Sequence, residues 1–422
     1  MTALDPSSPP LIIPRPEHAI SRKKIDRNAL KIMYRLKDHG FLAYLVGGAV
    51  RDLLLGRQPA DFDIATDATP QQIKRLFRNS RIIGRRFRLA HIFFTDRITG
   101  IQQIIEVATF RKEFTLTEGN QELAAAKPTI VNNIYGTPAE DVQRRDFTIN
   151  ALFYALDGFS VIDYLDGLAD LRDGIVRVIG DPYERLVEDP VRILRAMEFV
   201  CRLGFSLEEK TRAAMLFCAP RLAEVPASRM REELRGLYSK GTTSAMLELA
   251  TQLNLLNFWL PEPVQTTWAE AKKLLEAIEG TFPLEGDDQL LETLVTTSFI
   301  LPELINRCHL TPPAPLHEVA ETCEQLLQPL AGNLQLPRFQ RHRVKELIVG
   351  FFRLCSGDKR TKRLQKRADF HLSLFFFSQV SDLHRQELGN IAEFWHKQVR
   401  RWPPQKKYPG LELAALFQHL KR

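Results

Sequence analysis

Asp61 and Asp63, separated by Phe62, are the residues whose types and spacing suggest chemistry most directly. Side chains alternate along a strand, so two carboxylates two residues apart point to the same side of an extended segment. Four carboxylate oxygens on one side can hold one or two Mg²⁺ ions, which would neutralise charge on a transferring phosphate and activate an attacking hydroxyl. Such pairs also mark solvated strand ends. The pair therefore predicts a metal site only in the company of other signals.

Two adjacent glycines precede this pair. Gly47 and Gly48 follow an apolar segment at residues 41–46, predicted to be a buried strand, and Arg51 lies one turn into a predicted helix. Glycines allow backbone N–H groups to approach a ligand closely, and a guanidinium binds phosphate through two N–H groups. In this setting Gly47, Gly48 and Arg51 are predicted to bind a triphosphate, whereas two glycines alone would indicate an ordinary turn.

A third catalytic carboxylate is expected on a neighbouring strand, and the sequence offers Glu106 and Asp146. The choice between them stays open. Asp146 belongs to a cluster with Arg145 and Asn150 that provides donors and acceptors for ribose hydroxyls and phosphate. A helix-capping cluster with surface arginines explains the same residues equally well.

Asp189, Arg192 and Arg195 follow one another at a spacing of three residues, inside a helix predicted over residues 182–203. That spacing puts them roughly on one helix face. A carboxylate can accept from an exocyclic amine, and a guanidinium can donate to a ring nitrogen or carbonyl, so the three side chains are predicted to bind a nucleotide base. An intrahelical ion pair is the alternative.

Two cationic clusters suit an RNA backbone with occasional base stacking. For the second cluster, a solvated helix face is nearly as good an explanation. The net charge of +7 over 422 residues favours a polyanionic partner only weakly. The predicted RNA-binding residues are Arg85, Arg86 and Arg88 in the first cluster, and Lys362 and Arg363 in the second.

The chain is long enough for two to four domains. Apolar patterning and turn residues predict a mixed α+β region that changes to an all-helical pattern near residue 165. We predict a flexible tail at 1–20, a head with a small mixed sheet and covering helices at 21–165, a helical base-binding neck at 166–240, and a helical body with an RNA-binding tail at 241–422.

The pattern also predicts individual elements. Helices are expected at residues 25–39, 50–55, 71–77, 182–203, 207–218, 228–239 and 244–253, and strands at 41–46, 62–65, 82–83, 91–95 and 104–109.

The five cysteines are scattered and lack a paired spacing, which predicts buried thiols in a reducing compartment. The proline-rich segment 1–16 lacks the basic start and apolar core of a signal peptide, and the longest apolar runs are too short to cross a bilayer. These features predict a cytoplasmic protein without a transmembrane segment.

The motifs, in this order, resemble the class II family of tRNA nucleotidyltransferases and bacterial poly(A) polymerases over residues 12–240. Segments 13–23 and 84–91 are similar to the poly(A) polymerase members, whereas CCA-adding members usually have a less basic second segment. The resemblance implies a polymerase-β-like head followed by an all-α neck and body. It implies metal ligation by Asp61 and Asp63, with Asp146 as the further acidic position, triphosphate binding by Gly48 and Arg51, sugar binding by Arg145, Asp146 and Asn150, and base selection by Asp189 and Arg192.

The activity that the resemblance implies is template-independent addition of AMP from ATP to RNA 3′ ends, with release of pyrophosphate and two Mg²⁺ ions, for which Mn²⁺ can substitute. One alternative is a CCA-adding or A-adding enzyme acting on tRNA, which would use the same site. A second alternative is a catalytically silent RNA-binding protein, which would need the basic surfaces but not the carboxylates.

Overall fold

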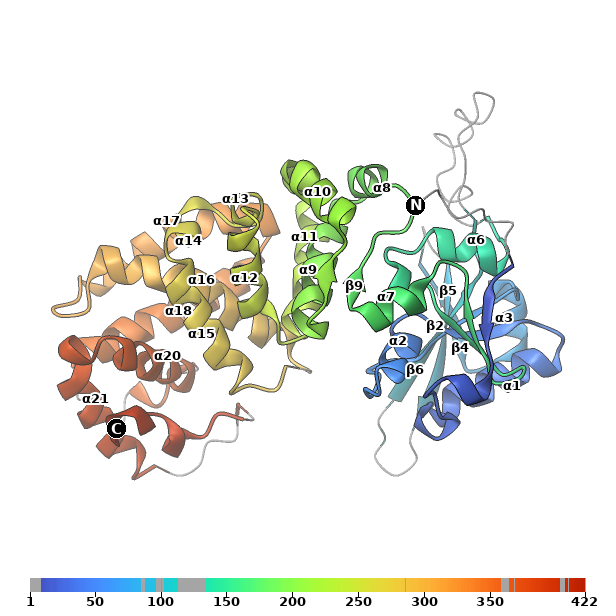
Figure 1. Cartoon of the computed structure of the whole chain (residues 1–422). Coiled ribbons are helices and arrows are strands. Elements are labelled where there is room, and N and C mark those ends of the chain that lie inside the picture. The colour runs from blue at the N-terminus through green and yellow to red at the C-terminus, as the bar shows by residue number, and fades with distance from the viewer. Residues whose placement is uncertain are drawn as a thin grey trace. The chain divides into compact units, whose positions relative to one another are not determined.

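The computed structural model describes residues 9–84, 88–95, 100, 102–112, 134–284, 286–357, 364–367, 369–402, 407–408 and 410–421 (Figure 1). The chain divides into two compact units. The first comprises Met1–Arg185 and Phe205–Ala214, and the second comprises Leu186–Gly204 and Met215–Arg422. The sequence pattern changes near residue 165, but the first unit continues beyond it and regains a short segment later in the chain. Each unit is described by itself below.

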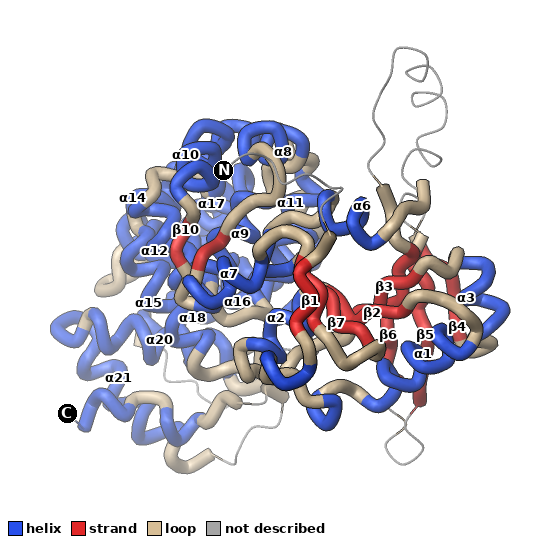
Figure 2. Tube along the Cα trace, turned by 45° about the vertical axis from the view of Figure 1, so that its right-hand side comes forward, coloured by secondary structure: helices blue, strands red, loops and turns tan. Residues whose placement is uncertain are grey.

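The first unit is built on one mixed sheet, whose strands lie side by side in Figure 2. Within the described residues the strand order is β1-β8-β7-β2-β3-β6-β5-β4. Strands β3 and β6 are parallel, and the other paired neighbours are antiparallel. The strands are β1 (Leu11–Ile13), β2 (Ala43–Val46), β3 (Asp63–Thr66), β4 (Ser80–Ile83), β5 (Leu89–Thr95), β6 (Gln102–Thr109), β7 (Phe153–Ala155) and β8 (Val161–Asp163).

Helices cover this sheet. Helix α1 (Arg27–Asp38) begins after Asp26, whose side chain accepts two backbone N–H groups of the first turn. It packs against β2 and β3, while α3 (Pro70–Leu76), which begins at a capping box on Thr69, packs against β4 and β5. The α+β class predicted for this part of the chain is confirmed. Further helices of this unit are α2 (Gly48–Leu54), α6 (Pro138–Gln143) and α7 (Gly167–Asp173).

The predicted flexible tail is wrong from residue 11 onward. Strand β1 pairs with β8, although the side chains of Leu11 and Ile12 are exposed. His18 lies within hydrogen-bond distance of the Phe159 carbonyl, 2.8 Å from its Nε2 atom. Backbone pairing at a sheet edge holds this segment, and a strand of three residues is too short to show the alternation from which strands are predicted.

The single helix predicted at 182–203 is two helices, α8 (Pro182–Glu188) and α9 (Arg192–Leu203). Pro190 lacks a backbone N–H and disfavours the helical conformation in the residue before it, so the helix is interrupted there. Asp189 therefore lies in the break and does not share a helix face with Arg192. The neighbouring helix α10 (Glu209–Cys218) begins later than expected, because β10 (Ser206–Leu207) pairs in parallel with β9 (Ile175–Val176).

The second unit is helical in its described part. Helix α16 is buried along most of its length and packs against α11, α15, α17 and α18. The helices are α9, α11 (Ala227–Tyr238), α12 (Thr243–Gln252), α13 (Leu256–Trp259), α14 (Glu262–Thr266), α15 (Trp268–Glu279), α16 (Asp288–Cys308), α17 (Leu316–Leu334), α18 (Arg338–Cys355), α20 (Phe370–Leu383) and α21 (Arg385–Val399).

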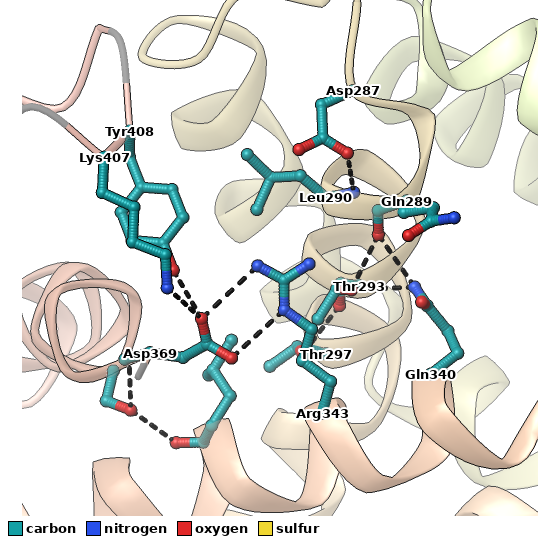
Figure 3. Close-up of polar contacts among 12 residues, drawn as sticks. Asp287, Gln289, Leu290, Thr293, Thr297, Gln340, Arg343, Asp369, Lys407 and Tyr408 are labelled. Atoms are coloured by element: carbon teal, nitrogen blue, oxygen red, sulfur yellow. Dashed lines mark hydrogen bonds and ion pairs between the residues drawn. The ribbon is translucent and has the colours of Figure 1, made fainter. Parts of the chain in front are cut away.

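Several polar side chains in this unit join its helices through hydrogen bonds (Figure 3). The Gln340 amide donates to the Gln289 carbonyl at 2.9 Å and to the Thr293 hydroxyl at 2.8 Å, which joins α18 to α16. Asp369, just before α20, accepts from Arg343 at 3.1 Å and from the Tyr408 hydroxyl at 2.5 Å. These contacts tie α18, the start of α20 and the segment near the C-terminus together.

No helix in the part of the chain that the structure describes has the length and apolar character needed to cross a membrane.

Candidate active site

Three carboxylates lie at adjacent positions of the sheet. Asp63 is the first residue of β3, and Asp61 lies two residues before it. Strands β3 and β6 pair in parallel with Ile64 opposite Val107, so the preceding position on each strand places Glu106 beside Asp63. Paired residues on neighbouring strands share a face of the sheet. The register therefore brings together residues far apart in the sequence.

Burial and the neighbouring carboxylates shift the pKa of Asp63. Burial, which has the largest effect, and the negative charges of Asp61 and Glu106 together raise the pKa to about 7, while Arg145 acts in the opposite direction. A carboxylate with this surrounding resists ionisation unless a cation is added. Arg145 is thus a cationic group close enough to act on Asp63.

Glu106 is held by a residue that sequence reasoning missed. His91 on β5 is paired in register with Glu106, and its Nε2 atom lies 2.9 Å from a Glu106 carboxylate oxygen. The charges that act on Asp63 include Glu106, and the Asp146 backbone carbonyl accepts from the Ile179 N–H at 3.2 Å. Of the two candidates for the third carboxylate, the structure places Glu106 beside Asp63.

The glycine pair forms the turn between β2 and α2. Gly47 has φ 66° and ψ −135°, a backbone conformation that residues with a Cβ rarely adopt. A Cβ added to Gly47 would lie 3.5 Å from Nη1 of Arg145, and one added to Gly48 would lie 3.4 Å from Nη2 of Arg51. The two guanidinium groups therefore flank the turn.

Arg51 is buried behind this turn, with 4 % of its surface exposed. Its Nε donates to Asp52 at 2.8 Å and its Nη1 donates to the side-chain oxygen of Asn150 at 2.6 Å. The residue that the sequence suggested for the triphosphate thus holds Asn150 against the glycine turn. The Arg51 guanidinium therefore has a structural role, because it donates hydrogen bonds to two side chains of the protein itself.

Arg145 is more accessible than Arg51 and is fixed from two sides. Its Nη2 donates to Asp141 at 3.0 Å, and its Nη1 donates to the Asn150 carbonyl at 3.3 Å. Its guanidinium also lies over the Phe153 ring, 5.2 Å from the ring centre. Asp141 was not among the predicted site residues, although its spacing of four residues from Arg145 on a helical segment is a signal for such a pair.

In the second unit, Asp189 and Arg192 are anchored by different partners. One oxygen of Asp189 accepts from Arg229 at 2.6 Å, and the other is buried with no hydrogen-bond partner in the described structure. Arg192 is almost fully buried and donates to Glu188 at 3.1 Å.

Arg195 forms a bidentate ion pair with Glu233, in which its Nε and Nη2 atoms lie 2.5 and 2.8 Å from the two carboxylate oxygens. An ion pair within the protein thus occupies much of its donor capacity.

Most of the predicted RNA-binding cations cannot be placed. Arg88 is exposed, and its carbonyl accepts from Arg111 at 2.9 Å. The other four, Arg85, Arg86, Lys362 and Arg363, lie outside the described residues.

Metal binding at the carboxylates would depend on few protein ligands. Among the described residues no group of three His, Cys, Asp or Glu side chains is arranged to hold one metal ion. Mg²⁺ in phosphoryl-transfer sites is commonly held by one or two carboxylates, with water and substrate phosphates completing the shell. Asp61 and Asp63 fit that mode, because their negative charges lie close together and Asp63 resists ionisation without a cation.

Comparison with known proteins agrees with this geometry. Residues 43–177, which contain the carboxylates and the glycine turn, match the poly A polymerase head domain. Residues 204–265 match a domain described as the probable RNA and SrmB-binding site of polymerase A. The chain belongs to the family of poly(A) polymerases and tRNA nucleotidyltransferases. Membership in this family agrees with the resemblance found in the sequence motifs.

Individual relatives extend the match. Poly(A) polymerase I of Escherichia coli O6:H1 is 46% identical over 256 residues, which is 59% of this chain and 53% of the relative. The CCA-adding enzyme of Leuconostoc mesenteroides subsp. mesenteroides is 38% identical over 242 residues, 57% of each chain. The chain thus spans about half the length of the curated relatives it matches.

Among solved structures, the Bacillus stearothermophilus CCA-adding enzyme in complex with CTP is similar with a TM-score of 0.58 and 26% identity, over 88% of this chain and 80% of that one. The predicted fold, a polymerase-β-like head followed by an all-α neck and body, is confirmed by this likeness and the head-domain match.

Proposed function

We propose that this chain is a template-independent polynucleotide adenylyltransferase that adds AMP from ATP to RNA 3′ ends and releases pyrophosphate. One observation carries the proposal: the register of β3 and β6 sets Glu106 beside Asp63, next to a glycine turn with a positive φ. Relatives named poly(A) polymerase I support adenylate as the unit added.

Asp61 and Asp63 are the residues that would hold Mg²⁺, or Mn²⁺ in its place, with Glu106 as the nearest further carboxylate. The bound cations would supply charge neutralisation at the transferring phosphate and lower the pKa of the attacking hydroxyl. The donor set fits this use because its charges repel one another strongly in the absence of a cation. The register of β3 and β6 and the effect of the Glu106 charge on Asp63 favour Glu106 over Asp146 as the third carboxylate.

The remaining residues bind and orient the substrate. The absence of a side chain at Gly47 lets phosphate oxygens approach the backbone closely, and Arg145, positioned by Asp141, presents a cation beside the same turn. Arg51 and Asn150 keep the turn in place. The RNA 3′ oxygen then attacks the α-phosphorus in line, and the bond to the bridging oxygen of pyrophosphate breaks. Most of the catalytic effect comes from position and charge.

Base choice and RNA binding are assigned to other residues. We assign base selection to Asp189 and Arg192, supported by the buried and unpaired oxygen of Asp189, with Arg195 as a supporting cation. We assign RNA binding to the helical neck and body and to the basic residues Arg85, Arg86, Arg88, Lys362 and Arg363. A cytoplasmic location is part of the same proposal.

A CCA-adding activity on tRNA is the second candidate. It is favoured by the likeness to the Bacillus stearothermophilus enzyme with CTP and to the Leuconostoc relative. The two candidates share the chemistry of the carboxylate site. They differ in which nucleotide is used and on which RNA.

The experiment supplies ATP or CTP separately, with Mg²⁺, to an unstructured oligoribonucleotide and to a tRNA lacking its CCA end. We expect repeated addition from ATP on the oligoribonucleotide and poor use of CTP. Efficient CTP use on the tRNA would establish the second candidate. No incorporation with either nucleotide, in Mg²⁺ or Mn²⁺, would leave a silent RNA-binding protein.

A further inference from the structure

A cationic hollow lies on the first unit, away from the residues used above. Its volume is about 720 Å³.

Four cations and one aromatic side chain dominate the lining of the hollow. None of the residues that line it in the described part of the chain is acidic. Arg22 donates to the Tyr34 hydroxyl at 3.1 Å and lies 4.0 Å from the centre of the Phe159 ring, which leaves its charge without a carboxylate partner among these contacts. The lining consists of Arg15, Ser21, Arg22, Lys23, Ile25, Arg27, Leu30 and Tyr34.

The sheet separates this hollow from the catalytic carboxylates. Gln103 and Glu106 are three residues apart on β6, so their side chains point to opposite faces. Gln103 accepts from Asn28 of α1 at 2.8 Å. Helix α1 therefore covers the face opposite to Glu106, and Arg27, Leu30 and Tyr34 present one side of that helix to the hollow.

A buried hydroxyl lies near the same cations. Tyr154 on β7 is fully buried, and its hydroxyl has no hydrogen-bond partner in the described structure. Burial raises the pKa of Tyr154, while the charges of Arg22 and Arg15 act to lower it, which shows that these cations lie close to it. Positive charge without carboxylates, with an aromatic ring at its edge, suits phosphodiesters and a stacked base.

We propose that this hollow binds single-stranded RNA upstream of the 3′ end. The proposal rests on RNA being the substrate of the carboxylate site. Because the hollow and the carboxylates lie on opposite faces of the sheet, only an RNA long enough to pass around the sheet can occupy both. A short primer should reach the carboxylates without touching the hollow.

The test uses the full chain carrying Lys23→Glu and Arg27→Glu together. Both side chains are exposed, and an acidic residue in the first turn of α1 favours the helix, so the variant is expected to fold. The control carries Arg75→Glu and Arg78→Glu, which make the same change in charge at exposed positions outside the hollow. Dissociation constants are measured over a range of salt for oligoribonucleotides of about 20 and about 6 nucleotides.

The hollow variant should bind the longer RNA about 10-fold more weakly, with a salt slope smaller by about 1.4, and should bind the shorter RNA as the parent does. Equal weakening of both lengths, or equal weakening by the control, would overturn the proposal, and so would unchanged binding of the longer RNA. Extension of the short primer by the parent is scored separately. Its failure would contradict the proposed function, whereas the length dependence of binding decides the role of the hollow.

Discussion

Asp63 in the first unit and Asp369 in the second are both partly buried carboxylates, and their surroundings are opposite. Burial together with the charges of Asp61 and Glu106 raises the pKa of Asp63 to about 7, against the effect of Arg145. Burial also acts to raise the pKa of Asp369, but hydrogen bonds from Arg343 and Tyr408 outweigh it and hold the pKa below its usual range. A carboxylate crowded by other carboxylates is typical of a ligand-binding site, whereas a carboxylate paired with hydrogen-bond donors stabilises the fold.

The largest expected effect comes from Asp63→Ala. We expect AMP incorporation to fall by at least about 10³-fold, because the variant loses a metal ligand. The free energy of unfolding in buffer without divalent ions should stay the same or rise, since a repelled carboxylate is removed. Single-turnover incorporation and urea denaturation measure the two. Activity close to that of the parent would contradict the assignment of the site.

Asp369→Asn should show the reverse pattern. It weakens charge-assisted hydrogen bonds to Arg343 and Tyr408, and we expect unfolding to become easier by about 2 kcal/mol. Incorporation by the folded fraction should be unchanged. Asp173→Asn is the matched control, because Asp173 pairs with Arg172 on the surface and its loss should change stability little. Equal losses in the two variants would remove the contrast between the regions.

Gly47→Ala tests the turn beside Asp63. The strained backbone and the approach to Arg145 should lower kcat/KM for ATP by about 10-fold. Gly56→Ala is the control, since Gly56 also has a positive φ, of 73°, but a Cβ there would meet nothing within 4 Å. A similar loss of kcat/KM in both variants would show that backbone strain alone, rather than the turn, is responsible.

The contributions of Asp63 and Asp369 to the free energy of unfolding should change with pH in opposite directions. The folded-state pKa of Asp63 is raised, so its contribution is present at low pH and is lost as the pH rises toward 7 without divalent ions. The pKa of Asp369 is lowered, so its contribution is present above the unfolded value near 4 and is lost as the pH falls below it. Urea denaturation of Asp63→Asn and Asp369→Asn at pH 3, 5 and 8 checks both signs, with the smallest differences expected here.

Long apolar segments of the head were predictable from sequence, and its short strands were not. The predictions at 41–46 and 104–109 overlap β2 and β6, because buried strands carry a continuous apolar signal. Strands β1, β7 and β8 have three residues each, which is too short to show the alternation that identifies a strand. The break at Pro190 was accessible in principle, since proline disfavours helix in the residue before it.

The site was predictable as a set of residues but not as an arrangement. Asp61, Asp63, Gly47 and Gly48 stand out by type and spacing. The placement of Glu106 depends on the parallel register of β3 and β6, which no local pattern specifies. That register, together with the effect of the Glu106 charge on the pKa of Asp63, favours Glu106 as the third carboxylate.

Titration of the two carboxylates by carboxyl-carbon NMR, with and without Mg²⁺, tests the central claim most directly. The account predicts that Asp63 titrates near pH 7 without divalent ions and at a much lower pH with Mg²⁺, while Asp369 titrates below its usual range in both conditions. An Asp63 that titrates near pH 4 and does not respond to Mg²⁺ would contradict it.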